Sequence, residues 1–358
     1  MLLVPGISAL LDNRVIKLQG VGKQRQINIG FTLSVTIMFF FRAFRAYTVG
    51  GDLYYYRLLF NFMGNYSWDS LLTVNNGYEA GFLYYNKIIY TLFHDFQALL
   101  ICTAIINVIS ILLFIKNNSR IPWLSLFLYI AMTFWPESFN IERQAIAFSF
   151  LLIGFSNIKN RRFFRYLFWV LLATSFHVSS IIWVVLYFVY NLKLDRKYWI
   201  AVIGGGIVVY IFAGSILRTA ISFLYANNGK YSTIVSTGAG RGYLLYLIGV
   251  LLIQMIIFYR YQDNDNKDTN LFIHMLVIAV LLQLLSLQLP FVVRAVRLFS
   301  ISIIFLIPED ISMLRGKESK LLAEAAMIII FGAWFVSFIS AGVNNSQGVV
   351  PYITMWGL

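Results

Sequence analysis

Uniformly apolar stretches of close to 20 residues recur along this chain from residue 27 to residue 342. Each is long enough to cross about 30 Å of hydrocarbon as a helix. A helix satisfies its own backbone hydrogen bonds in lipid, whereas a β-barrel requires short strands of alternating polarity. The composition agrees, because only 12% of the residues are charged, against about 25% in soluble domains. The sequence therefore predicts an all-α, polytopic integral membrane protein.

The apolar stretches predict about eleven transmembrane helices in a single transmembrane domain of residues 1–358. The stretch 79–94 is too short and too polar for a span, and we expect it to form a re-entrant or interfacial helix. The longest connections are about 49–95 and 218–241. The spans themselves are expected at about 27–48, 96–115, 121–135, 140–158, 163–177, 178–192, 197–217, 242–259, 271–289, 291–308 and 321–342.

The distribution of basic residues predicts the orientation of these spans. Residues 1–26 lack the apolar core and cleavage site of a signal peptide. They contain the basic residues Arg14, Lys17, Lys23 and Arg25, and we expect them to form a cytoplasmic N-terminal segment. Alternation of the spans then places 18 of the 28 Lys and Arg residues on the cytoplasmic side, as the positive-inside rule requires. The C-terminal segment has no basic residue after Lys320 and is predicted to be periplasmic.

Ten basic residues are placed against this bias, at or near the predicted outer face. Arginine at membrane depth is costly and usually has a function. The two longest connections are predicted on the same face, so a functional site is expected there. The ten residues are Arg42, Arg45, Arg57, Lys87, Arg143, Arg218, Lys230, Arg241, Arg294 and Arg297.

Neither a metal site nor nucleic-acid binding is expected. Cys102 is the only cysteine, and the three histidines are too far apart in sequence to form a ligand-spaced cluster. The net charge of +13 is explained by basic cytoplasmic loops beside anionic lipid. No metal and no cofactor is therefore predicted, and nucleic acid is not an expected partner.

Acidic and aromatic residues of the first long connection are candidates for a substrate site. Asp52 follows a Gly-Gly turn in "GGDLYYY", and Glu79 opens the helix predicted at 79–94 in "YEAGF". Glu79 is a candidate general base or ligand of a sugar hydroxyl, and Tyr56 and Tyr78 are candidate sugar-binding residues. Alternatively, the tyrosines form an interfacial aromatic belt and Glu79 is a simple helix cap.

Two further segments contribute polar residues to the predicted outer face. "NIERQAIAFSF" places Arg143 and Gln144 at the start of one span, and "FHVSS" places His177 and Ser179 at the junction of two later spans. Two crossings separate the segments, so both return to one face. A histidine can accept a proton or bind phosphate near neutral pH. The alternatives are a snorkelling arginine and a structural histidine.

A pair of arginines follows Pro290 in "LQLPFVVRAVRLFS". Arg294 and Arg297 are three residues apart and share one helix face. Paired guanidinium groups suit the binding of pyrophosphate. Together with Arg143, they could supply three cationic groups to one cavity.

Several of these segments together resemble the EpsG family of bacterial membrane proteins, which includes Wzy-type O-antigen and capsule polymerases. They are "GGDLYYY", "YEAGFLYYNKIIY", "NIERQAIAFSFLLIGF", "KNRRFFRYLFWVLLATSFHVSSIIW" and the terminal "VVPYI". The resemblance extends from about residue 30 to 352. Its most specific part is Arg143, Gln144 and Ala147 with the downstream His177 and Ser179.

The resemblance implies a glycosyltransferase of the inner membrane with a periplasmic active site and a GT-C-like architecture. The growing glycan on undecaprenyl pyrophosphate would be transferred to a sugar hydroxyl of a new lipid-linked repeat unit. Arg143, Arg294 and Arg297 would bind the pyrophosphate, and Glu79, Asp52 or His177 would be the base. Gln144, Tyr56, Tyr78 and Ser179 would contact substrate. A chain-length regulator and a flippase are the partners to expect, besides membrane lipid and the lipid-linked repeat units.

Three other functions share parts of this pattern. A polysaccharide-to-lipid ligase uses the same donor on the same side of the membrane. A sugar O-acyltransferase with His177 as base would need arginines on the inner face. A flippase for lipid-linked oligosaccharides would need inverted repeats and polar groups at mid-membrane, and the sequence shows neither.

Overall fold

Helices form most of the structure, as the apolar stretches predict. The computed structural model describes residues 4, 6, 15–20, 23–73, 77–224, 240–260, 266–287, 289, 292–344 and 347–357. All eleven predicted spans coincide with helical segments in these residues. The described chain divides into two compact units, each made of separate stretches of sequence. The first contains residues 1–155, 167–181 and 307–358, and the second contains residues 156–166 and 182–306.

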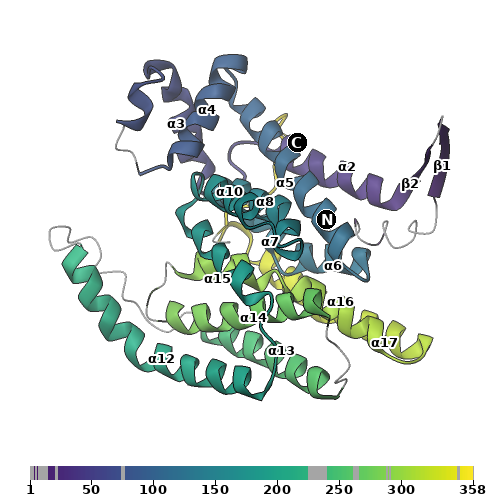
Figure 1. Ribbon diagram of the computed structural model, residues 1–358. Coiled ribbons are helices and arrows are strands. Elements are labelled where there is room, and N and C mark those ends of the chain that lie inside the picture. The colour runs from purple at the N-terminus through teal and green to yellow at the C-terminus, as the bar shows by residue number, and fades with distance from the viewer. Residues whose placement is uncertain are drawn as a thin grey trace. The chain divides into compact units, whose positions relative to one another are not determined.

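A short β-hairpin precedes the first long helix and was not predicted. Strands β1 (Val15–Gly20) and β2 (Lys23–Asn28) are antiparallel, and their register runs from Val15 opposite Asn28 to Gly20 opposite Lys23. Helix α2 (Ile29–Ala43) follows β2 directly (Figure 1). Apolar and polar residues alternate over Ile16–Gln19, as they do in a β-strand. The sequence-based prediction assigned no secondary structure to residues 1–26, so it missed this strand.

Helix α5 (Phe96–Asn118) is central to the first unit, where it packs against α2, α4 (Ala80–Phe93) and α8 (Glu142–Gly154). Helix α3 (Leu53–Phe62) contacts α4, and α17 (Lys317–Ser340) contacts α6 (Pro122–Ala131). The unit also contains α7 (Phe134–Glu137) and three short 3-10 helices, η1 (Met63–Asn65), η2 (Ser70–Leu72) and η6 (Gly342–Asn344).

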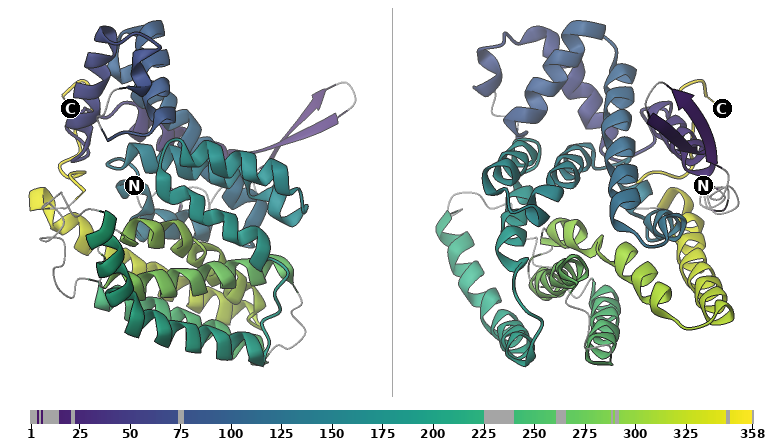
Figure 2. Two further views of the ribbon diagram at one scale, coloured as in Figure 1. Left: turned by 60° about the vertical axis from the view of Figure 1, so that its left-hand side comes forward. Right: turned by 45° about the vertical axis from the view of Figure 1, so that its right-hand side comes forward.

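Helix α14 (Lys267–Ser286) is the corresponding centre of the second unit. It contacts α11 (Val185–Val189), α12 (Arg196–Leu224), α13 (Arg241–Arg260) and α15 (Val293–Ser300). Figure 2 shows α12, α13 and α14 side by side. The buried His274 of α14 holds the chain between α11 and α12, because its ring nitrogens lie 2.8 Å from the Tyr198 hydroxyl and 3.2 Å from the Leu192 carbonyl oxygen.

Four predicted spans consist of two shorter helical pieces each. Thr133 adopts a left-handed conformation (φ 68°) that separates α6 from α7. The segments 140–158 and 291–308 contain α8 with α9 (Ser156–Lys159), and α15 with α16 (Ile303–Met313). The segment 178–192 contains η3 (Val178–Val184) and α11. Helix α10 (Phe163–Thr174) precedes η3, and α10, η3 and α16 each contain residues of both units.

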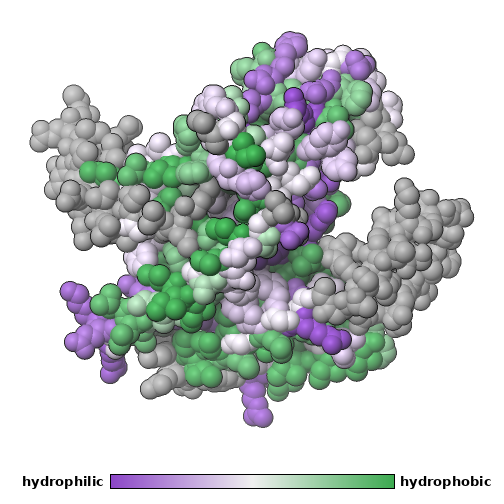
Figure 3. Space-filling view, turned by 180° about the vertical axis from the view of Figure 1, so that it is seen from behind, coloured by the Kyte–Doolittle hydropathy of each residue, from purple (hydrophilic) through white to green (hydrophobic). Residues whose placement is uncertain are grey.

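Among the described residues, three helices are long and apolar enough to cross a membrane: α5, α14 and α17. Broad apolar areas on the surface fit such an environment (Figure 3). A helix at 79–94 is confirmed, since α4 ends at His94 in a left-handed conformation. The number of spans, the position of α4 in the membrane and the orientation of the termini stay predictions. Helix α12 continues to Leu224, into the connection predicted at 218–241. Residues 225–239 of that connection, including Lys230, lie outside the described residues.

The C-terminal segment 347–357 runs along the connection between α2 and α3. Backbone hydrogen bonds join Ala46 to Ile353 (2.9 Å), Phe44 to Met355 (2.8 Å) and Gly50 to Gly348 (2.8 Å). The approach is tight at Gly348, which has a φ of +62° and whose added Cβ would lie 2.8 Å from the backbone nitrogen of Gly51. No other residue fits this position without backbone movement.

The substitution Gly348→Ala should therefore destabilise the protein by about 1–2 kcal/mol, because it combines a left-handed backbone with a steric clash. Gly332→Ala in α17 is the control, since an added Cβ there meets no atom within 4 Å. Thermal unfolding of the purified variants in detergent measures the difference. Equal unfolding temperatures for the two variants would contradict the close approach.

Candidate active site

Helix α8 begins with two oppositely charged neighbours whose side chains have separate partners. Glu142 and Arg143 both lie in its first turn, about 100° apart around the helix axis. Glu142 is 1% exposed and contacts two arginines of the first unit, whereas Arg143 is 18% exposed and contacts Glu79. Arg143 therefore does not hold Glu142 in place.

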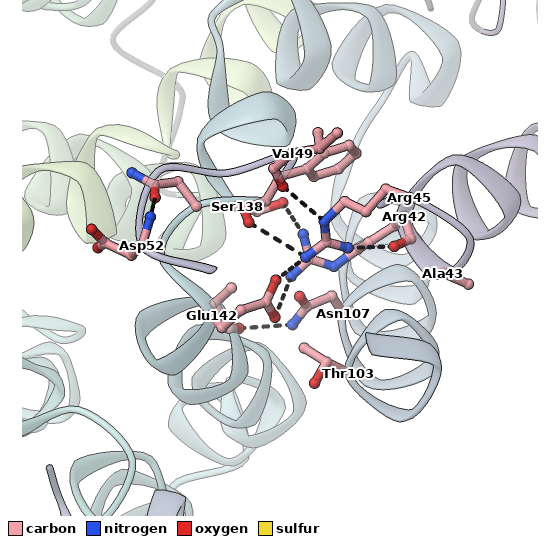
Figure 4. Close-up of polar contacts among 12 residues, drawn as sticks. Arg42, Ala43, Arg45, Val49, Asp52, Thr103, Asn107, Ser138 and Glu142 are labelled. Atoms are coloured by element: carbon pink, nitrogen blue, oxygen red, sulfur yellow. Dashed lines mark hydrogen bonds and ion pairs between the residues drawn. The ribbon is translucent and has the colours of Figure 1, made fainter. Parts of the chain in front are cut away.

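The partners of Glu142 are Arg42 and Arg45, both fully buried (Figure 4). One Glu142 oxygen accepts a hydrogen bond from Nη2 of Arg42 at 3.1 Å, and the other accepts from Nη2 of Arg45. Arg42 also donates to Ser138 Oγ at 2.7 Å. Both guanidinium groups lie over the ring of Phe139, at 5.4 Å and 4.9 Å.

Burying such a cluster of charges costs free energy, and so does removing one of its members once it is buried. Removing one member of a buried ion pair leaves an uncompensated charge away from water. Arg45 has additional acceptors in the carbonyl oxygens of Arg42, Val49 and Phe139. The cluster thus joins the end of α2, the following connection and the start of α8 into one fixed unit.

Arg42 and Arg45 are among the basic residues predicted at the outer face, but their partner was not predicted. Their spacing of three residues at the end of an apolar stretch was the available signal. It is the same spacing that singled out Arg294 and Arg297. The identity of the partner could not be read, because Glu142 is 100 residues from Arg42 in sequence.

The side chains of Arg143 and His177 both lie beside the carboxylate of Glu79. Its Oε2 accepts a hydrogen bond from Nη1 of Arg143, and its Oε1 accepts one from the backbone nitrogen of Val178 at 3.2 Å. The Nδ1 atom of His177 lies 3.5 Å from the same Oε1. Three segments separated in sequence thus meet at one carboxylate, and the predicted grouping of Glu79, Arg143 and His177 is present.

These neighbours keep Glu79 ionised. Burial favours the protonated form, but the contact with His177, the charge of Arg143 and nearby backbone N–H groups outweigh it. Together they lower the pKa of Glu79 to about 2. The carboxylate is therefore a fixed negative charge at neutral pH and a poor proton acceptor.

Two of the predicted tyrosines lie beside this cluster. The guanidinium of Arg143 lies 4.9 Å from the ring centroid of Tyr78, and the rings of Tyr56 and Tyr78 are 6.2 Å apart. Burial raises the pKa of Tyr56 to about 12, although the nearby Arg143 acts in the opposite direction. Tyr56 is thus a neutral hydroxyl group at physiological pH.

Gly81 allows α4 to bring Glu79 close to His177. Its backbone nitrogen donates to the Ser175 carbonyl oxygen at 2.8 Å. A Cβ on Gly81 would lie 2.7 Å from that oxygen, so the "EAGF" motif carries a packing requirement next to its acid. On the other side, the Phe150 ring lies 5.3 Å from Phe176, which ties α8 to the residue before His177.

The remaining predicted residues of the first unit are Asp52, Gln144 and Ser179, which belong to three different segments. Asp52 precedes α3, and its backbone nitrogen donates to Asn140 Oδ1 at 2.6 Å. Gln144 is buried in the first turn of α8. Ser179 follows in η3, and its buried hydroxyl has no hydrogen-bond partner in the described part of the chain.

Arg294 and Arg297 belong to the second unit. Both lie on α15, where Arg297 donates to the Tyr243 hydroxyl at 3.3 Å and Arg294 is exposed. Their convergence with Arg143 stays a prediction. Among the described residues, no three metal-binding side chains of the His, Cys, Asp and Glu types gather in one place.

The two charged neighbours of α8 should differ sharply in their effect on stability. Glu142→Gln leaves two buried guanidinium groups without a carboxylate and should cost about 3–5 kcal/mol. Arg143→Gln breaks a partly exposed pair and should cost about 1 kcal/mol or less. Thermal unfolding in detergent compares them, and a larger loss for Arg143→Gln would refute the assignment of partners.

Comparison with known protein families identifies a family for this chain. The EpsG family matches residues 28–354, nearly the whole chain, and this range includes every residue of both charged clusters. No curated protein and no solved structure matches the chain. The chain therefore belongs to the EpsG family, whose members are Wzy-like polymerases.

Proposed function

We propose that this protein polymerises a bacterial surface polysaccharide at the periplasmic face of the inner membrane. The growing glycan is transferred from undecaprenyl pyrophosphate to a terminal sugar hydroxyl of a new lipid-linked repeat unit. Family membership supports a polymerase-like function. The observation that supports this reaction best is the cluster of Glu79, Arg143 and His177, which places an acid, a cation and an imidazole together.

His177 is the group we propose as general base. Its Nδ1 faces Glu79, and its buried Nε2 has no hydrogen-bond partner in the described part of the chain. A substrate hydroxyl would be that partner once the site opens to admit it, because Nε2 is buried in this structure. Glu79 is a poor base because its pKa is about 2, so its role is to orient the imidazole and stabilise the imidazolium that forms.

Arg143 is the group we propose to bind the pyrophosphate. In the reaction, the acceptor oxygen bonds to the anomeric carbon as the bond from that carbon to the phosphate oxygen breaks. The bonding electrons leave with the pyrophosphate, and the hydroxyl proton passes to His177. A preorganised cation beside the leaving oxygen stabilises the charge that develops there. Arg294 and Arg297 are proposed as further cations for the same group.

The tyrosines complete the proposed site. Tyr78, which lies against Arg143, and Tyr56 provide aromatic faces and neutral hydroxyl groups suited to a sugar ring. Asp52, Gln144 and Ser179 are proposed as additional substrate contacts. A site with these components needs no metal to neutralise the leaving group.

Loss of the base should abolish long polymer. His177→Ala should lower the transfer rate by about 10²- to 10⁴-fold, and Arg143→Ala should have a comparable effect. Each variant is expressed in cells that lack their own polymerase, and the surface polysaccharide is separated on a gel. Single repeat units support the proposal, whereas retained ladders remove the substituted residue from the site. Wild-type protein that leaves these cells with single repeat units only would favour a ligase or a flippase instead.

Gly81→Ala tests the geometry without removing a reacting group. The added methyl group should push Glu79 away from His177 and reduce polymer formation at least about tenfold, since small displacements of catalytic groups are costly. Gly242→Ala in α13 is the matched control, because its Cβ would meet no atom within 4 Å. Equal polymer yields from the two variants would show that the contact between α4 and Ser175 does not matter.

A further inference from the structure

Trp68 is a large aromatic residue exposed within a polar turn. It lies between η1 and η2 and is 45% exposed. Its neighbours Asn65, Ser67 and Asp69 are also exposed. The exposed hydrophobic residues of α12 and α17 lie in continuous apolar sequence, as lipid contact requires, whereas Trp68 has hydrogen-bonding groups on both sides. Its surroundings therefore differ from those of a hydrocarbon-facing residue.

The indole is held in a fixed position. It stacks on the ring of Tyr84 in α4, with centroids 6.4 Å apart and an interplanar angle of 14°. Lys87, on the next turn of α4 and only 8% exposed, donates to the carbonyl oxygens of Met63 (2.8 Å) and Tyr66 (2.7 Å). Its Nζ lies 5.8 Å from the Trp68 ring. The turn that carries Trp68 is thus pinned to α4 by a buried cation.

The same helix carries the candidate active site. Glu79 is the residue before its first turn, and Tyr84 is five residues later, about 7.5 Å along the helix axis. Trp68 and Glu79 are therefore held by one short, rigid element.

We propose that Trp68 is a binding platform for the glycan chain, separate from the reacting groups. The apolar face of a pyranose ring stacks on the exposed indole, and the sugar hydroxyls bond to the neighbouring amide, hydroxyl and carboxylate groups. A flat aromatic surface bordered by such groups is complementary to a sugar, which has an apolar face and a polar edge. The proposal rests on the proposed function, because it assigns a subsite to the polymer of that reaction.

The test compares Trp68→Leu with Trp68→Tyr. Leucine keeps an apolar contact with lipid but provides no flat ring, whereas tyrosine keeps the ring. With purified protein and a defined lipid-linked repeat unit, Trp68→Leu should shorten the polymer several-fold while the first transfer stays within about twofold of wild type. Trp68→Tyr should largely restore the length. Phe62→Leu, another exposed aromatic residue (52% exposed), is the matched control and should leave length unchanged.

Direct binding separates this proposal from the function on which it rests. Soluble glycan made of the same repeat should bind the Trp68→Leu variant about three- to tenfold more weakly than wild type, whether or not the preparation polymerises. Equal binding, or a length restored as well by leucine as by tyrosine, would overturn the platform and indicate lipid contact. If the wild-type protein binds glycan through Trp68 but forms no polymer, the proposed polymerase function is contradicted while the proposed binding platform is retained.

Discussion

The ion pairs between Glu142 and two fully buried arginines are the constraint on which the candidate site depends. A carboxylate with 1% exposure is tolerated only because Arg42 and Arg45 compensate its charge and Ser138 and Phe139 complete the contacts. The cluster fixes the first turn of α8. Since Arg143 is the next residue of that turn, the buried ion pairs of Glu142 also determine where the partly exposed guanidinium of Arg143 can lie.

Adjacent residues of α8 consequently have different roles. Glu142 faces inward and joins α2 to α8, while Arg143 reaches Glu79 and, through it, His177. The low pKa of Glu79 follows from this meeting of groups. It makes Glu79 a fixed negative charge beside His177. Gly81 and Gly348 support the arrangement by allowing backbone segments to approach more closely than any side chain permits.

The sequence was informative where the physics is local. Apolar length predicted the helical segments that coincide with the eleven expected spans, but not α3, which lies in the connection expected at about 49–95. The positions of Glu79, Arg143, His177, Tyr56 and Tyr78 predicted a grouping that the structure brings together. The ion-pair partner of Arg42 and Arg45 could not be predicted, because the sequence does not indicate which acidic residue lies beside a given arginine. The sequence-based prediction also missed the hairpin of β1 and β2. Hydropathy averaged over about 20 residues conceals an apolar–polar alternation that is only four residues long.

By itself, the sequence determined that the chain is helical and apolar enough for a membrane and that it belongs to the EpsG family. These properties depend on residue type and order along the chain. Only the tertiary structure decided that Glu142 pairs with Arg42 and Arg45 and that Arg143 pairs with Glu79. The partners are 100, 97 and 64 residues apart, and which of several like charges meets a carboxylate depends on how helices pack, not on their spacing in sequence.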